Sequence, residues 1–374
     1  MISGASNAPL GLTLHGVPLR ISSELGAFTS YVEETMRPFL GPPSSRVRVE
    51  SRLEWVEGAP GRDLKAAFGV DAWDRRPDRD LYIAGSTAYW LRIDDFEDLQ
   101  LAVTWDEQCL FVRGRYHFRM GRGRGEALRK LLYRGRLDAL RGRRFSTLLY
   151  YLIYHPILWV LSREKGWHLL HGGAAASANG AALFGGMPGC GKSTLAVAMT
   201  ADAQWTLLSD NLVLHDAERV LACPELLLLD ARSLERVGKA ASRLRSTGER
   251  RVYERNAYRP ETMLLEPTRP SAIFNVERGC ATSMEEISPR ACAARLAVDT
   301  WMAKEVRRCM LMGHVLDLAS GRGAPEPRVD LEKLTAASRC YSLRIAEGAA
   351  LSEVIERYVL KAVRSDPSSR RQTA

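Results

Sequence analysis

The sequence has little of what an oxidising compartment or a membrane would require. Its seven cysteines are scattered, odd in number and without a C-x-x-C pair, which argues against a disulfide framework. The first residues lack a basic segment followed by an apolar one, so no secretory signal is predicted. The longest apolar run, Leu148–Leu161, is too short to span a bilayer and contains Pro156, so we expect a buried helix there. We therefore expect a protein of the reducing cytoplasm with no membrane partner.

Acidic residues are fewer than basic ones. The 374 residues include 53 Lys and Arg against 44 Asp and Glu, a formal net charge of +9. Such a balance suits anionic partners, from nucleotides to acidic peptides. Many of the cations gather in Arg119–Arg144, which is either a surface for an acidic peptide or for phosphates, or a solvated helix face. Few aromatic residues accompany these arginines, which argues against nucleic acid as a partner.

One short stretch carries a specific chemical pattern. Residues 186–193 fit the phosphate-binding (Walker A) pattern G-x-x-x-x-G-K-[ST]. Its glycines let backbone N–H groups approach phosphate oxygens, and the start of a following helix adds its positive end. Lys192 is expected to meet the β- and γ-phosphates, and the Ser193 hydroxyl to bind Mg²⁺. The predicted nucleotide-binding residues are Gly186, Met187, Pro188, Gly189, Cys190, Gly191, Lys192, Ser193 and Thr194.

The surroundings of this stretch suit a phosphate loop. Two strand-like segments upstream, His168–Ala175 and Ala181–Phe184, are joined by an Asn-Gly pair, which is a strong hairpin signal. Downstream, Thr206–Asp210 reads as a buried strand that ends in an acid. An acid in that place can hold Mg²⁺ or take a proton near the γ-phosphate. We therefore expect Ser193 and Asp210 to be the metal ligands.

The order of segments predicts an α/β protein with two domains and a linker. Short alternating segments before residue 120 indicate a domain rich in antiparallel strand. One of them, Arg46–Val56, alternates with Val49, Ser51 and Leu53 on one face, which predicts a half-buried strand. The charged stretch 231–262 indicates a mobile segment or a lid. The polar end of the chain predicts a disordered tail. The predicted boundaries are an α+β N-terminal domain at 1–120, a basic and apolar helical connector at 121–166, a P-loop domain at 167–362 and a tail at 363–374.

Together these residues resemble the HPr kinase/phosphorylase family and its related kinases. The resemblance rests on Leu170-His171-Gly172, the hairpin, Gly186–Thr194 and Leu207–Asp210, and it covers about residues 165–360. It implies a P-loop kinase domain of HPr-kinase-like type, with a mixed sheet and a hairpin before the phosphate loop. It also implies that ATP and Mg²⁺ are the cofactors and that self-association into a homo-oligomer is possible.

The same resemblance assigns catalytic roles. Asp210 corresponds to the general base that takes the proton of a serine hydroxyl, His171 to an assisting group, and Lys192 to the cation on the phosphates. An aspartate of ordinary pKa, about 3.9, is ionised at pH 7 and ready to accept a proton.

Two departures narrow the analogy. The family members that act on HPr have two consecutive acids where this chain has Asp210-Asn211, and asparagine cannot act as a base. Glu225 and Glu235 are the acids available for a further Mg²⁺-side role. The N-terminal region has no counterpart in the family, so HPr is not supported as the substrate. Kinases that modify a serine of a ribosomally made peptide, such as lasso-peptide kinases, are the closer analogy.

The sequence therefore predicts an ATP- and Mg²⁺-dependent kinase that transfers the γ-phosphoryl group to a hydroxyl, foremost a Ser or Thr of a peptide or small protein. Two alternatives remain open. One is a kinase of small-molecule alcohols, and the other is a nucleotide-regulated binding module or ATPase.

Overall fold

A computed structural model describes residues 8–42, 46–119, 137–250, 255–323 and 331–364. The chain folds into two compact units. The first consists of residues 1–165 and 308–326, and the second of residues 166–307 and 327–374. The structure thus differs from the predicted domain boundaries, because the described part of the 121–166 connector belongs to the first unit. Most of the basic segment Arg119–Arg144 lies outside the described residues.

The first unit is built on an eight-stranded sheet with the order β1-β2-β3-β8-β7-β6-β5-β4. The β2–β3 and β3–β8 pairs are parallel and the other pairs are antiparallel. In β3, buried Val49, Ser51 and Leu53 alternate with more exposed residues, as the sequence predicted for this half-buried strand. The strand bounds are β1 Leu10–Leu14, β2 Val17–Ser23, β3 Val49–Glu57, β4 Arg75–Asp78, β5 Leu81–Ala84, β6 Thr87–Trp90, β7 Leu99–Trp105 and β8 Leu110–Phe118.

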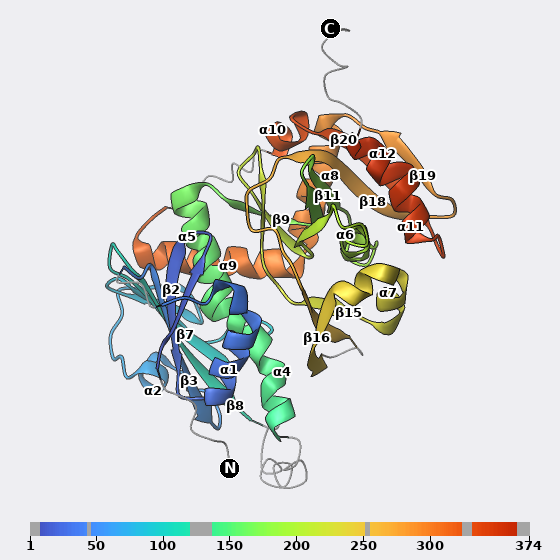
Figure 1. The fold of residues 1–374 in the computed structure, drawn as a ribbon. Helices are drawn as coiled ribbons and strands as arrows, with labels where there is room; N and C mark the ends of the chain where they lie inside the picture. The colour runs from blue at the N-terminus through green and yellow to red at the C-terminus, as the bar shows by residue number, and fades with distance from the viewer. Residues whose placement is uncertain (1–7, 43–45, 120–136, 251–254, 324–330, 365–374) are drawn as a thin grey trace. The chain divides into compact units, whose positions relative to one another are not determined.

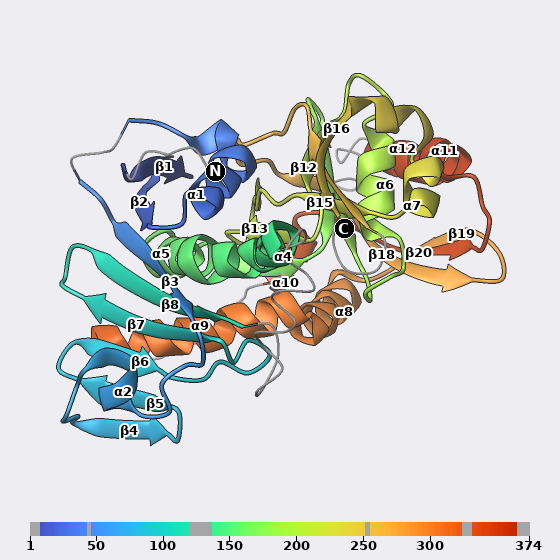
Figure 2. The same ribbon diagram turned by 90° about the horizontal axis from the view of Figure 1, so that it is seen from below.

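One long helical segment covers β2, β3 and β8 (Figure 2). It runs through α4 (Leu137–Leu149), a π-helical turn η3 (Tyr150–Tyr154) and α5 (His155–Lys165). Its stretch 140–165 is long and apolar enough to cross a membrane, but 78% of the most apolar window is buried, as in a core helix. The expected buried helix is confirmed. The π-helical turn directly precedes Pro156, whose missing N–H interrupts the regular bonding.

Further helical elements also belong to the first unit. They are α1 (Gly26–Thr35), the 3-10 turn η1 (Arg37–Phe39), α2 (Leu64–Phe68) and the greater part of α9 (Lys304–Ser320), which begins in the second unit. Within the first unit, α9 is tied to α5 because Asp317 accepts a hydrogen bond from Trp159 Nε1 at 2.7 Å.

The second unit is α/β, with a six-stranded mixed sheet of order β12-β10-β11-β18-β20-β19 (Figure 1). Strands β12, β11, β18 and β20 run in one direction, and β10 and β19 run against them. The carboxyl ends of the four parallel strands therefore meet at one edge, which we call the carboxyl edge, and their starts form the amino edge. The bounds are β10 Gly173–Ser177, β11 Gly180–Gly185, β12 Thr206–Ser209, β18 Pro270–Gly279, β19 Ser283–Glu286 and β20 Arg339–Ala346.

Alternate residues of the central strands pack into two separate hydrophobic cores, one on each face of the sheet. Phe184 and Phe274 stack with ring centroids 5.4 Å apart on the face covered by α6 (Lys192–Met199) and the C-terminal helices. Leu183 and Ile273 point to the other face, where α8 (Pro289–Met302) packs. The C-terminal helical segment comprises α11 Leu351–Val354, the π-helical turn η5 Ile355–Val359 and α12 Leu360–Arg364, and α10 Leu331–Ala336 lies with α8.

Two small sheets complete the second unit. The first has the order β14-β13-β9 and the second the order β15-β17-β16. The bounds are β9 His168–His171, β13 Leu212–His215, β14 Val220–Ala222, β15 Leu227–Leu229, β16 Leu244–Arg250 and β17 Asn256–Pro260. Helix α7 (Ala231–Arg236) and the 3-10 turn η4 (Gly238–Arg243) connect β15 to β16.

One expectation about the second unit needs correction, and two others can be compared with its secondary structure. The expected strand His168–Ala175 is two strands, because β9 pairs with β13 and β10 pairs with β11. The break falls at Gly172, where a Cβ would lie 2.8 Å from the Phe184 carbonyl oxygen. The expected lid at 231–262 consists, in its described residues, of α7, η4 and two paired strands. The predicted hairpin before the phosphate loop is confirmed as β10–β11.

Candidate functional site

The segment predicted to bind phosphate lies at the carboxyl edge, between the end of β11 and the start of α6. Gly186, Gly189 and Gly191 have φ values of +136°, +83° and +109°, which favour glycine. A Cβ at Gly186 would lie 2.4 Å from the Val276 carbonyl oxygen of β18, so only glycine fits there. The backbone of this loop is therefore fixed by its glycines, as phosphate binding through N–H groups requires.

Lys192 is the first residue of α6 and is only 5% exposed. Its Nζ donates hydrogen bonds to the carbonyl oxygens of Gly186, at 2.7 Å, and Met187, at 3.1 Å. Burial lowers the pKa of Lys192, although Cys190, Asp299 and Asp210 oppose this shift. The ammonium group thus lies inside the loop, where it can reach bound phosphates.

Asp210 follows β12 and comes close to the start of α6. The Ser193 hydroxyl donates to the Asp210 backbone carbonyl at 3.4 Å. Burial raises the pKa of the Asp210 carboxyl, against the opposing effects of Ser193 and Lys192, so the ordinary value expected from the sequence is wrong. Its Oδ1 has no hydrogen-bond partner among the described residues. The Ser193 hydroxyl and this carboxylate are the groups at this position that could hold Mg²⁺.

His171 ends β9 and is 5% exposed. Burial, with a smaller effect of the Lys192 charge, lowers its pKa to about 4, so the ring is neutral at pH 7. Neither ring nitrogen has a hydrogen-bond partner in the described part of the chain. Its backbone N–H donates to the Thr300 hydroxyl of α8 at 3.1 Å. The imidazole is therefore a buried neutral group that lies close enough to Lys192 to be affected by its charge.

The structure brings these three predicted residues together through the backbone at Gly173. A Cβ at Gly173 would lie 3.1 Å from the Asp210 carbonyl oxygen and 3.2 Å from that of Lys192. The preceding Gly172 donates its N–H to the Asn211 carbonyl at 3.1 Å. The hairpin and the β9–β13 pair thus place His171, Lys192 and Asp210 around one point of the carboxyl edge.

A cavity of about 270 Å³ opens above the N-terminus of α6. Its described lining includes four arginines but only Asp230 and Glu347 as acids, and Arg232 lies 3.6 Å from Glu347. An excess of guanidinium groups around a helix N-terminus suits a polyanion such as a nucleotide triphosphate. The lining arginines are Arg232, Arg236, Arg255 and Arg278.

A second cavity, of about 890 Å³, lies on the other side of the phosphate loop against α8. Exposed Met187 and Val298 line it together with Asp299, which is only 7% exposed. Sequence reasoning missed Asp299, although a signal was present. Cys292, Leu296 and Asp299 are spaced by four and three residues on the buried face of α8, so an acid occupies a position typical of a core residue.

The two candidate acids for a further Mg²⁺-side role have different positions. Glu225 Oε2 accepts a hydrogen bond from Asn211 Nδ2 at 3.2 Å, directly after Asp210. Glu235 is in α7 and does not line either cavity beside the loop. Glu225 is therefore the better placed of the two.

No cluster of three or more potential metal ligands occurs within the described ranges. Cys190 of the loop has its pKa raised by burial, which disfavours a reactive thiolate.

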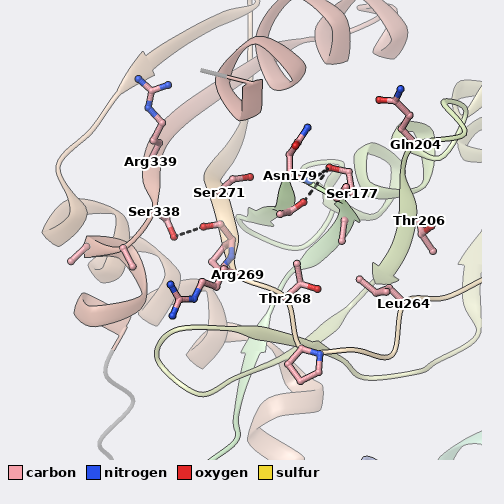
Figure 3. Close-up of a pocket in the computed structure, with 17 residues that line it drawn as sticks. Ser177, Asn179, Gln204, Thr206, Leu264, Thr268, Arg269, Ser271, Ser338 and Arg339 are labelled. Carbon is pink, nitrogen blue, oxygen red and sulfur yellow. Dashed lines mark hydrogen bonds between the residues drawn. The ribbon is translucent and has the colours of Figure 1, made fainter. Parts of the chain in front are cut away.

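A third cavity, also of about 890 Å³, lies at the amino edge (Figure 3). Several of its hydroxyl groups already donate hydrogen bonds within the chain, since Ser338 donates to the Pro270 carbonyl at 3.0 Å and Ser271 to that of Ala181 at 3.2 Å. Arg269 and Arg339 point in different directions (Figure 3). Ligands of such sheets bind at the carboxyl ends of the strands, so this cavity is not the primary candidate.

Comparison with known proteins gives no family for this chain. No family model matches it, and no curated protein matches it.

Proposed function

We propose that this chain is an ATP- and Mg²⁺-dependent kinase that phosphorylates a hydroxyl, foremost a Ser or Thr of a peptide or small protein. The observation that carries the proposal is the convergence of the buried Lys192, the Ser193 hydroxyl and Asp210 at the carboxyl edge, beside an arginine-lined cavity. A P-loop kinase domain of the HPr kinase/phosphorylase type accommodates this arrangement. The free state of all seven cysteines supports a cytoplasmic location.

Each residue has a definite part in the proposed reaction. Bound ATP supplies the γ-phosphoryl group, which leaves ADP and forms a new P–O bond with the acceptor oxygen. Lys192 and the loop N–H groups offset the negative charge of the phosphates. Asp210 orients the acceptor hydroxyl and receives its proton, and burial makes this carboxylate a stronger base than an exposed one. The neutral His171 can donate or accept a hydrogen bond without adding charge.

The test is phosphoryl transfer by Asp210→Asn and Asp210→Ala proteins. The substrates are γ-labelled ATP with Mg²⁺ and serine-containing peptides encoded beside this gene, and a parallel set of small alcohols, with products read by mass spectrometry. We expect transfer to fall by about 10²- to 10⁴-fold, because the base acts on the acceptor, while the affinity for nucleotide measured without Mg²⁺ stays within a few fold.

Asp216→Asn is the matched control. Asp216 lies in the turn after β13 and pairs with Arg219 rather than with the loop, so transfer should be unchanged. Transfer that survives in Asp210→Ala would disprove the assigned base. Phosphorylation of a small alcohol alone would favour the second kinase hypothesis, and ATP hydrolysis without any acceptor would favour an ATPase.

A further inference from the structure

Two cavities flank the phosphate loop, and the proposed reaction needs a place for an acceptor as well as for a nucleotide. The arginine-lined cavity of about 270 Å³ suits the nucleotide, whereas the cavity of about 890 Å³ lies against α8. The two linings share Gly189, Cys190 and Arg278. The cavities therefore adjoin at the loop, and a molecule in the larger one would lie beside a nucleotide in the smaller one.

Exposed apolar side chains line the larger cavity and continue along α8. Met187 of the loop and Val298 of α8 are part of its lining. Trp301 and Met302 follow Val298 by three and four residues, so they share its face of the helix. In the described residues of the second unit, these four are all of the large hydrophobic side chains that are exposed. We call them the apolar strip, because clustering of this kind is typical of an interaction surface.

The far end of the apolar strip lies beside a candidate catalytic residue. Thr300, the neighbour of Trp301 in α8, accepts a hydrogen bond from the backbone N–H of His171 at 3.1 Å. The near end of the strip, Met187, belongs to the phosphate loop itself. The strip thus extends from the loop to the strand end that contains His171, and the proposed reaction needs its acceptor hydroxyl held close to these groups.

Cations lie at both ends of the apolar strip. Arg278 lines the cavity near the loop. At the other end, exposed Arg307 donates hydrogen bonds to the carbonyl oxygens of Trp301 at 3.3 Å and Met302 at 2.6 Å. A partner that has acidic residues beside its apolar ones is therefore complementary in charge to this surface.

The acids in the lining of the larger cavity do not reverse this charge. Glu277 pairs with Arg295 at 3.0 Å, and Asp299 is buried. An acidic partner therefore meets no exposed acid without a cation beside it in this lining.

We propose that the apolar strip is the docking surface for the acceptor peptide, and that it selects peptides with large apolar and acidic residues near the phosphorylated Ser or Thr. Apolar side chains of the peptide cover Val298 and Trp301, and its acids pair with Arg278 and Arg307. The inference rests on the proposed function for the need of an acceptor, and it goes further by naming the class of peptide.

The test measures the binding of short fluorescein-labelled peptides, without nucleotide, by fluorescence anisotropy. Three peptides share one serine and differ in its neighbours, which are apolar and acidic, apolar and basic, or acidic and polar. We expect the first peptide to bind most tightly. Trp301→Ala and Val298→Asp should weaken its binding by about tenfold or more, because each removes an apolar contact at the centre of the surface. Equal binding of the three peptides, or unchanged affinity in both variants, would overturn the proposal.

Trp73→Ala is the matched control. Trp73 is a tryptophan of the first unit and is 46% exposed, against 59% for Trp301, so its loss should leave peptide affinity unchanged. A second copy of this chain is the competing occupant of the strip. A dimer that dissociates in Val298→Asp, measured by sedimentation velocity, together with unchanged peptide affinity would refute the acceptor role.

The absence of nucleotide from the binding test separates this proposal from the proposed function. Peptide binding that depends on Trp301, in a protein that transfers no phosphoryl group, would support the docking surface and contradict the kinase function. Transfer to the serine peptides with the same KM in Trp301→Ala as in the unaltered protein would contradict the docking surface alone.

Discussion

The two edges of the six-stranded sheet both have cavities, but the polar groups around these cavities differ in their hydrogen bonding. At the carboxyl edge, Lys192 and Asp299 are buried beside the loop. The two ring nitrogens of His171 and the Oδ1 atom of Asp210 have no hydrogen-bond partner among the described residues. At the amino edge, the cavity of about 890 Å³ is lined by hydroxyls that are bonded to nearby carbonyls, as Ser338 is. Cavities of about 890 Å³ occur at both edges, so cavity volume alone does not distinguish them.

Buried polar groups without a hydrogen-bond partner are a better indicator of a functional site than cavity volume is. Buried polar atoms are almost always hydrogen-bonded, so a cluster that lacks partners indicates a role beyond stability. By this criterion we expect a ligand at the carboxyl edge rather than at the amino edge. Three predictions test the contrast, from the largest expected effect to the smallest.

The largest effect is expected from Gly186→Ala compared with Gly189→Ala. Alanine at Gly189 meets open space and adds only the strain of a left-handed backbone, about 1–2 kcal/mol. At Gly186 the new Cβ would also lie 2.4 Å from the Val276 carbonyl oxygen. Backbone strain and this steric contact together are expected to cost about 3 kcal/mol or more. We expect the free loop to relieve this strain by leaving the binding conformation, so that nucleotide affinity falls by roughly a hundredfold, measurable by titration calorimetry. Equal losses in the two variants would mean that the close approach to β18 does not matter.

An intermediate effect is expected from the pH dependence of stability. The folded pKa of His171, about 4, is below its unfolded value of about 6.5. As pH falls from 6.5 to 4, the unfolded chain takes up a proton that the folded imidazole does not, so stability falls over this window. The loss is about 3 kcal/mol for the complete shift. Urea unfolding at several pH values measures it, and His171→Asn should be less sensitive to acid.

His155 is a natural reference for that experiment. It lies in the first unit, where burial lowers its pKa to about 3, so its acid sensitivity should persist in the His171→Asn protein. An unchanged pH dependence of the second unit in that variant would show that the His171 ring is solvated rather than buried.

Local patterns were sufficient to predict several features of this molecule. The Asn-Gly turn predicted the β10–β11 hairpin, the glycine spacing predicted a tight loop with glycines at positive φ between β11 and α6, and the alternation of Val49, Ser51 and Leu53 predicted the buried face of β3. Each of these depends on residues close together in the chain. The acid at the end of β12 was also found, because strand and acid are adjacent in the sequence.

Features that depend on distant contacts could not be predicted. Alternation in β3 gives its buried face but not its parallel partner β8. The break at Gly172 follows from its close approach to Phe184, and the strands within 231–262 follow from the pairing of β17 with β15 and with β16. Asp299 looks like one more helix charge until the packing of α8 against the loop is known. The candidate site was therefore predictable in its glycine loop and in Asp210, which adjoin a strand or a helix in the sequence, and unpredictable in Asp299, which lines the cavity beside the loop from α8.

The smallest effect is expected at the amino edge, from Ser338→Ala. The Ser338 hydroxyl is 7% exposed and lies 3.0 Å from the carbonyls of Pro270 and Leu334. Its loss should cost about 1 kcal/mol in the free energy of unfolding and leave nucleotide affinity unchanged. Ser242→Ala, at an exposed hydroxyl, is the control and should change stability by less than about 0.5 kcal/mol. If Ser338→Ala weakened nucleotide binding, the amino edge would be coupled to the loop, and the division of the sheet into a functional and a structural edge would be wrong.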